Sequence, residues 1–81
     1  MLKDAREARQ FLEDLCTPAE LEAMVDRWRV VPLLLADVPY RDIHERTAVS
    51  VTTIGRVART LDHGAGGYRL AAERLGHRSG H

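Results

Sequence analysis

The stretch VVPLLLA, residues 30–36, constrains the fold of this chain more than any other. A helical stripe of apolar residues leads into it: Leu21, Met24, Val25, Trp28, Val31 and Leu35. From Val30 onward the sequence is apolar all round, which implies burial on every side. A chain of 81 residues buries only about 60% of the surface it exposes when unfolded. We therefore expect a second subunit to supply part of this burial.

Apolar residues recur at helical spacing along the rest of the chain, and no segment alternates with a period of two over a useful length. The sequence therefore predicts an all-α fold of about five to six helices. These helices are expected over roughly residues 3–15, 18–35, 40–47, 51–61 and 68–75. We expect residues 1–75 to form a single domain and residues 76–81 to form a disordered tail.

Local signals predict how two of these helices begin, bend or end. Thr17 is a good N-cap, Pro18 suits the first helical position, and Glu20 completes a capping box. Pro32 lacks an N–H and crowds the preceding turn, so we expect a kink or a break there. Three glycines within residues 64–67 should end the fourth helix, at least one of them as a left-handed C-cap.

Cysteine content and hydropathy exclude several classes of protein. The single cysteine, Cys16, cannot form an intrachain disulfide or a thiolate metal cage. No apolar run approaches the roughly 20 residues of a membrane span, and the N-terminus is charged and amphipathic, unlike a signal peptide. No nucleophile–base constellation, carboxylate pair or phosphate loop is present. We expect a cytoplasmic protein that is not an enzyme, binds no membrane and holds no metal or cofactor.

Residues 40–59, YRDIHERTAVSVTTIGRVAR, match a helix-turn-helix. A short helix and a three-residue turn precede a second helix that Ser50 caps. Apolar residues fill the usual packing positions of the motif: Ile43, Val49, Ile54 and Val57. This packing leaves the N-terminal half of the second helix, expected over residues 51–61, facing outward.

The outward residues of this second helix suit contact with DNA better than they suit solubility. Threonine and glycine are poor helix formers, and no acidic residue lies between Ser50 and Leu61. Small hydroxyl-bearing or methyl-bearing side chains can approach base edges, and arginine binds guanine or phosphate. The residues expected to contact double-stranded DNA are Arg41, Arg46, Ser50, Val51, Thr52, Thr53, Gly55, Arg56 and Arg59. Of these, Arg41 and Arg46 are expected nearer the phosphates, and Val51 near a thymine methyl group.

Two positions depart from the usual helix-turn-helix pattern. His44 stands where a small residue is common, and we expect it to be a partly buried packing residue. Ala48 stands where the turn normally has a glycine with positive φ, and alanine in that conformation costs on the order of 1 kcal/mol. We expect either that the turn opens slightly or that a dimer contact compensates.

The net charge of zero conceals an asymmetry along the chain. Residues 1–26 hold three basic and seven acidic side chains, a balance of −4. Residues 27–81 hold nine arginines and five acidic side chains, a balance of +4. Such separation favours a polyanionic partner on the basic part, with the acidic surface held away from it.

Four segments stand in a distinctive order and spacing: LCTPAELEA (15–23), RW (27–28), TTIGRV (52–57) and GAGGYRLA (64–71). Together they resemble the Trp repressor superfamily, most of all its YerC/YecD-type branch, over Phe11 to Leu75. The resemblance implies an intertwined homodimer whose two helix-turn-helix units meet successive major grooves of DNA. It also implies that the protein is a transcriptional repressor, and it places Pro32 and the surrounding apolar run in a dimer core.

The same resemblance implies where a small-molecule effector would bind. The repressor's ligand pocket draws on four residues, which match Thr17, Arg27, Arg56 and Thr60 here. The residue after the recognition-helix arginine is glycine in the tryptophan-binding protein, whereas this chain has Val57. A valine branch there fills space that the indole ring needs. We therefore do not expect tryptophan to bind, and another small effector stays open.

Two classes of function remain open from the sequence. The first is a sequence-specific, dimeric transcriptional regulator, a repressor by resemblance. The second is a dimeric protein-interaction module derived from a helix-turn-helix, with weak or no DNA binding. His44, Ala48, Pro32 and the near-neutral charge favour this second class. A steep fall of duplex affinity with salt would separate the two, because phosphate contacts release counterions.

Overall fold

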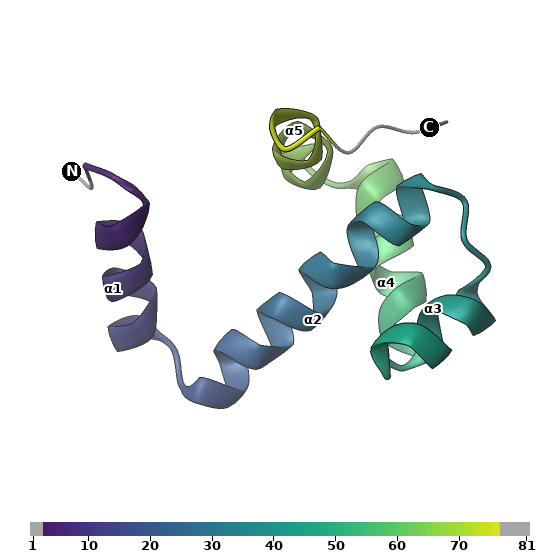
Figure 1. Ribbon diagram of the computed structural model, residues 1–81, viewed down its shortest axis with the longest axis horizontal. Coiled ribbons are helices and arrows are strands. Elements are labelled where there is room, and N and C mark those ends of the chain that lie inside the picture. Colours follow the sequence, from purple (N-terminus) through teal and green to yellow (C-terminus); the bar gives the residue numbers. More distant parts are fainter. Residues whose placement is uncertain (1–2, 77–81) are drawn as a thin grey trace.

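The structure is a computed structural model that describes residues 3–76, and these residues form five α-helices and no strand (Figure 1). In chain order the helices are α1 (Ala5–Leu15), α2 (Pro18–Leu35), α3 (Tyr40–Thr47), α4 (Val51–His63) and α5 (Gly67–Arg74). The all-α prediction is confirmed. The tail expected over residues 76–81 lies outside the described residues, apart from Gly76.

The capping box predicted at the start of α2 is confirmed. The Thr17 hydroxyl accepts a hydrogen bond of 3.1 Å from the backbone N–H of Glu20. In return, the Glu20 carboxylate accepts one of 2.8 Å from the backbone N–H of Thr17. This backbone hydrogen bond, together with the one to the Thr17 side chain, lowers the pKa of Glu20 from its ordinary value of 4.5.

Helix α2 runs through Pro32 without a break, so of the two outcomes expected there the break is excluded and the kink stays a prediction. An interior proline costs a helix about 3 kcal/mol, because one hydrogen bond is lost and the ring crowds the preceding turn. Full burial of a valine or leucine contributes about 1.5–3 kcal/mol. Val30, Val31 and Leu35 are all buried around the proline, and together they outweigh its cost.

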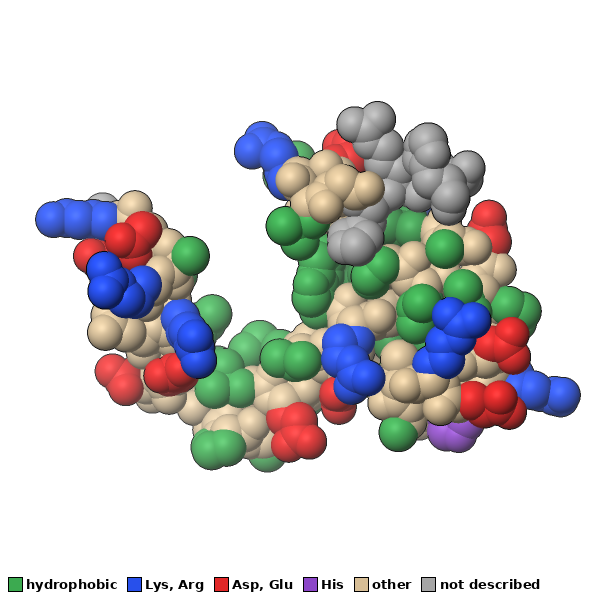
Figure 2. All heavy atoms as spheres, viewed as in Figure 1, with side chains coloured by type: hydrophobic (Ala, Val, Ile, Leu, Met, Phe, Trp, Pro, Cys, Tyr) green, Lys and Arg blue, Asp and Glu red, His purple; other side chains and the backbone are tan. Residues whose placement is uncertain are grey.

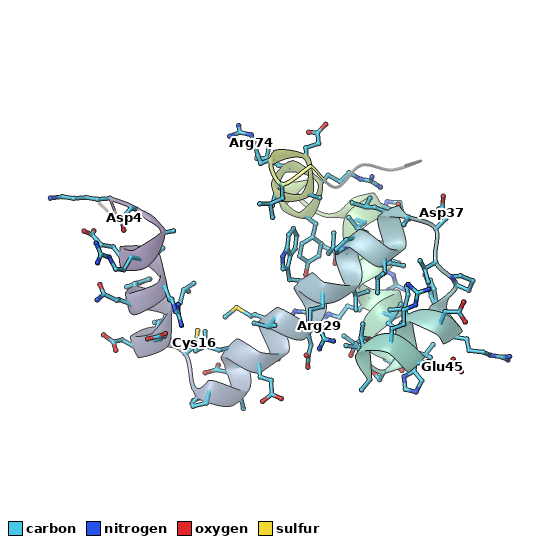
Figure 3. The ribbon with its side chains drawn as sticks, in the orientation of Figure 1. Asp4, Cys16, Arg29, Asp37, Glu45 and Arg74 are labelled. Atoms are coloured by element: carbon cyan, nitrogen blue, oxygen red, sulfur yellow. The ribbon has the colours of Figure 1, made fainter. Side chains whose placement is uncertain are left out.

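A Schellman motif ends α2 and turns the chain toward α3. The N–H of Val38 donates to the carbonyl of Leu33, and the N–H of Asp37 donates to that of Leu34, both at 3.0 Å. Asp37 has a φ of 59°, and Figure 3 shows it where α2 ends. Aspartate tolerates this left-handed conformation better than most residues, which suits it to this position.

The core lies where the C-terminal half of α2 meets α3, α4 and α5. The buried residues are all apolar: Val30, Val31, Leu35, Ile43, Val49, Ile54, Val57, Leu61 and Ala72. At the edge of this core, the rings of Trp28 in α2 and Tyr68 in α5 lie 6.4 Å apart between centroids. These two rings connect α5 to the middle of α2.

Helix α1 and the first half of α2 leave apolar surface uncovered. No residue of α1 is buried, and the Leu15 side chain is 66% exposed. Figure 1 shows α1 standing apart from α3, α4 and α5. Figure 2 shows an open concavity between α1 and α5, and hydrophobic side chains of α1, α2 and α5 border it. A cavity of about 410 Å³ lies between α1 and α2, lined mainly by Ala5, Ala8, Leu12, Leu21 and Val25.

The glycines after α4 act differently from the prediction. Gly64, the C-cap, has a φ of −83° and a ψ of −161°, so the expected left-handed C-cap is wrong at this residue. Its N–H donates to the carbonyl of Thr60 at 2.8 Å, and a Cβ on Gly64 would lie 2.6 Å from that oxygen. Close approach therefore requires this glycine. The left-handed residue is Gly66, with a φ of 88°, which precedes α5.

No helix in residues 3–76 is both long and apolar enough to cross a membrane. Even α2, with 18 residues, carries charged side chains in its first half. Its apolar second half packs against the other helices instead.

The capping box generates a prediction about the dependence of stability on pH. The folded pKa of Glu20 lies below its unfolded value. Its stabilising contribution is therefore full above the unfolded pKa and is lost as the pH falls through the folded pKa. We expect Glu20→Gln to keep the capping box and to flatten the loss of unfolding free energy from about pH 5 to pH 3, measured by urea unfolding.

Glu22→Gln is the matched control, because Glu22 is exposed on the same helix and lies outside the capping box. It should keep the acid dependence that Glu20 provides. Equal flattening by both substitutions would contradict the assignment.

Candidate nucleic-acid interface

Helices α3 and α4 form a helix-turn-helix with a turn over residues 48–50. The four apolar residues expected to hold the motif together are buried: Ile43, Val49, Ile54 and Val57. Val49 lies in the turn before α4, and Ile54 and Val57 lie on the inner face of α4. These three buried residues fix α4 along its inner side. The opposite side of its N-terminal half faces solvent, as the sequence predicts.

The turn between the two helices holds a strained alanine. Ala48 has a φ of 63° and a ψ of 9°, so it adopts the left-handed conformation that glycine usually supplies. Its N–H donates to the carbonyl of His44 at 2.8 Å. The Thr47 hydroxyl donates to the carbonyl of Ile43 at 2.7 Å and accepts from the N–H of Val49 at 3.1 Å. The turn therefore does not open, and hydrogen bonds within the chain hold it.

His44 contributes to the same turn in a way that the sequence did not predict. It is exposed, so its expected role as a partly buried packing residue is wrong. Its Nδ1 atom lies 2.7 Å from the carbonyl oxygen of Val49. Because a carbonyl can only accept, Nδ1 carries the hydrogen in this contact. A smaller side chain at this position could not reach across the turn.

Ser50 and Thr53 serve the start of α4. The Ser50 hydroxyl accepts a hydrogen bond of 3.1 Å from the backbone N–H of Thr53. It also donates to the Thr53 hydroxyl at 3.0 Å. Ser50 is thus the N-cap that the sequence predicts. Both residues were also predicted to contact DNA, and in this structure their hydroxyls bind each other.

The outward face of α4 carries a hollow of about 660 Å³. Six residues line it: Tyr40, Val51, Thr52, Gly55, Arg56 and Arg59. Five of the nine predicted DNA-contacting residues thus meet at one site. Tyr40 was not predicted, because only the angle between α3 and α4 brings its side chain to the hollow. Arg41 and Arg46 are exposed on α3 and do not line the hollow.

The hollow combines apolar walls with positive charge. Tyr40 is 42% exposed and Val51 is 51% exposed, which are high values for large apolar side chains. Arg56 and Arg59 are exposed, and neither belongs to an ion pair within residues 3–76. An anionic partner with apolar groups on its surface would match both features.

Arg69 fixes the far end of α4. Its Nε donates to the carbonyl of Leu61 at 3.0 Å, and its Nη2 lies 3.5 Å from a carboxylate oxygen of Asp62. The arginine thereby satisfies one of the last carbonyls of the helix from α5. Sequence reasoning missed this role, because no local pattern predicts a contact across eight residues and a glycine turn.

Of the residues of the expected effector pocket, Thr17 and Arg27 lie apart along α2, whereas Arg56 and Thr60 lie one turn apart on α4. Thr17 caps the start of α2, at the end of that helix away from α4 (Figure 1). Ten helical residues, or about 15 Å, separate it from Arg27. On α4, the Thr60 hydroxyl donates to the carbonyl of Arg56 at 3.0 Å. Val57 is 1% exposed and lies in the core.

Within the described residues, no three histidine, cysteine, aspartate or glutamate side chains gather as metal ligands would. Cys16 lies at the junction of α1 and α2 and is half-buried (Figure 3). The chemistry of the interface therefore rests on the hydroxyl, guanidinium and apolar groups of α3 and α4.

Comparison with known proteins gives one family throughout. The family model described as Trp repressor protein matches residues 1–76. The uncharacterized protein YerC of Bacillus subtilis (strain 168) is 36% identical over 74 residues, which cover 91% of this chain and 71% of YerC. The resemblance found in the four sequence segments is therefore confirmed.

Two crystal structures are similar in fold. A TrpR-like protein from Eubacterium eligens superposes with a TM-score of 0.83 at 43% identity, over 95% of this chain and 79% of that one. A Staphylococcus aureus protein, provisionally described as a Trp repressor, superposes with a TM-score of 0.84 at 29% identity, over 98% and 79%. The likeness includes α1 as well as the helix-turn-helix, because it covers almost the whole chain.

The strained turn generates a prediction about stability. Glycine at position 48 would relieve about 1–2 kcal/mol of left-handed strain. It would also lower the stability by about 0.4–1 kcal/mol, because glycine gives the unfolded chain more conformational freedom. We expect Ala48→Gly to raise the free energy of unfolding by about 0.5–1 kcal/mol, measured by urea unfolding at fixed protein concentration.

Asp37→Gly is the control, since Asp37 has nearly the same φ and an aspartate side chain that tolerates it. It should gain less stability than Ala48→Gly. A larger gain at Asp37 would show that hydrogen bonds already remove the strain at Ala48.

Proposed function

Because the chain belongs to the Trp repressor family, we propose that it is a transcriptional repressor that binds specific double-stranded DNA sequences as a homodimer. The observation that carries this proposal is the hollow face of α4, where two arginines that form no ion pair within residues 3–76 flank small and methyl-bearing side chains. That face lies on the second helix of a helix-turn-helix, which enters the major groove in such motifs.

Each group of side chains has a proposed role on the duplex. Arg56 and Arg59 bind guanine edges, while Thr52 and Val51 meet neighbouring bases. Ser50 and Thr53 lie at the end of α4 that approaches the DNA, and their hydroxyls can turn from each other to a phosphate. Helix α3 crosses the sugar–phosphate backbone, where Arg41 and Arg46 neutralise phosphates. His44 and Thr47 hold the turn between the two helices through their hydrogen bonds to Val49.

The uncovered apolar surface supports the homodimer. Phe11, Leu12 and Leu15 of α1 are exposed, as are Val25 of α2 and Leu70 of α5. Clusters of exposed large apolar side chains are characteristic of association surfaces. A second copy would cover these flanks and would present two α4 helices to successive major grooves of one duplex.

We propose that tryptophan is not the effector of this protein. The four pocket-matching residues are retained, but the buried Val57 side chain occupies the place of a glycine. Thr17 and Thr60 also use their hydroxyls within their own helices. A small effector of different shape remains open, and Arg27 and Arg56 are the residues that would bind its charge.

Selection of bound sequences from a random duplex pool tests the proposal most directly. A homodimer should enrich a palindrome whose half-sites lie about one helical turn apart. A salt titration on the selected duplex should then give a slope of log K against log salt of about −4, because Arg41 and Arg46 of both protomers neutralise four phosphates. No affinity for any duplex at about 50 mM salt would favour a protein-interaction module instead.

Arg56 carries the sharpest single prediction. We expect Arg56→Ala to weaken binding to the selected site by about 1–3 kcal/mol and to relax the preference at one base pair in each half-site, measured by fluorescence anisotropy on a panel of single-base variants. Arg74→Ala is the matched control. Figure 3 shows Arg74 on α5, projecting away from the rest of the molecule. Equal weakening on every sequence would instead make Arg56 a phosphate contact.

A further inference from the structure

Gly55 lies in the middle of α4 and has no structural need to be glycine. Its φ is not positive, and a Cβ built there would meet no atom within 4 Å. Alanine would therefore fit and would favour the helix. The absence of a side chain at this point has one geometric effect, which is to deepen the hollow on the outward face.

The walls beside Gly55 are apolar. Val51 lies one helical turn before it, and the Tyr40 ring reaches the same hollow from the start of α3. Both side chains are substantially exposed, although the core of the same chain buries Val30 and Val31 completely. A hydrogen-bonding group placed against them would lose water without gaining a partner.

The rim of the hollow is positively charged. Arg56 and Arg59 line it together with the Thr52 hydroxyl. The hollow thus has apolar walls and a positively charged rim. Its occupant should carry a small apolar group close to negative charge and hydrogen-bond acceptors.

We propose that this hollow receives the C5 methyl group of a thymine in the major groove, with Gly55 as its floor and Val51 and Tyr40 as its walls. The inference rests on the proposed DNA binding and names the base that the site reads. Thymine is the only standard base with an apolar group on its major-groove edge, beside its O4 acceptor. The flanking phosphates and a neighbouring guanine supply the negative charge and the acceptors for Arg56 and Arg59.

Deoxyuridine provides the direct test, because it differs from thymidine only by lacking this methyl group. On the selected duplex, each thymine is replaced singly by deoxyuridine, and affinity is measured by anisotropy. We expect one position in each half-site to lose about fourfold in affinity, the value of one buried methyl group, and the symmetric double replacement to lose about fifteenfold. Replacing that thymine by 5-methylcytosine should lose less affinity than replacing it by cytosine.

Gly55→Ala places a methyl group in the hollow and should remove this discrimination. The variant should bind the thymine duplex more weakly than wild type does and should bind the thymine and deoxyuridine duplexes equally. Gly67→Ala is the matched control. A Cβ on Gly67 also meets nothing within 4 Å, and Gly67 lies in α5, outside the hollow. It should keep the fourfold difference, while thermal unfolding verifies that both variants fold.

Two results would overturn the inference while leaving DNA binding intact. One is a specific duplex in which no deoxyuridine replacement changes the affinity. The other is a thymine preference that survives undiminished in Gly55→Ala, which would place the methyl contact elsewhere. Failure to bind any duplex is a third and distinct result, and it would overturn the proposed function itself.

Discussion

Burial of the C-terminal half of α2 is the interaction on which the rest of the structure depends. Val30 and Val31 are completely buried, and they lie where α3, α4 and α5 converge on α2. This burial keeps α2 helical through Pro32 and gives α4 a fixed inner face through Ile54, Val57 and Leu61. Because packing determines the position of α4, its outward residues do not have to stabilise the helix. Poor helix formers can therefore occupy that face.

The distribution of burial divides the chain into two parts with different requirements. The helix-turn-helix and its support are complete within one chain, since its packing residues and turn hydrogen bonds are all internal. Helix α1 and the first half of α2 bury almost nothing of their own, although their apolar stripes are well formed. A substitution on α1 should therefore weaken association with a second copy more than it changes the outward face of α4. A substitution on the outward face of α4 should change that face and leave association intact, provided that it spares the buried residues.

Most of the fold could be predicted from the sequence because local and tertiary preferences agree in it. The capping box at Thr17, the N-cap at Ser50 and the 3.6-residue periodicity each mark a helix that packing also favours. Predictions failed where tertiary packing outweighed a single local conformational preference. At Pro32 the burial around it keeps the helix unbroken. At Gly64 the backbone approaches Thr60 closely without the left-handed conformation that a C-cap glycine usually has. For the site, periodicity along α4 identified five of the six lining residues. Periodicity could not identify Tyr40, because only the angle between α3 and α4 brings this residue to the hollow.

The contrast between Ala48 and Gly55 gives the strongest reason to treat the α4 face as selected for a partner. At Ala48 the backbone needs positive φ, and glycine would meet that need without strain, yet the chain has alanine. At Gly55 the backbone is helical and the space is open, so alanine would meet every internal need, yet the chain has glycine. Hydrogen bonds from Thr47 and His44 hold the turn from within the chain, so it keeps its conformation despite the alanine. Nothing within residues 3–76 accounts for the second. Helix propensity favours alanine at Gly55, so the glycine fits the proposed approach of a thymine to the open side of α4.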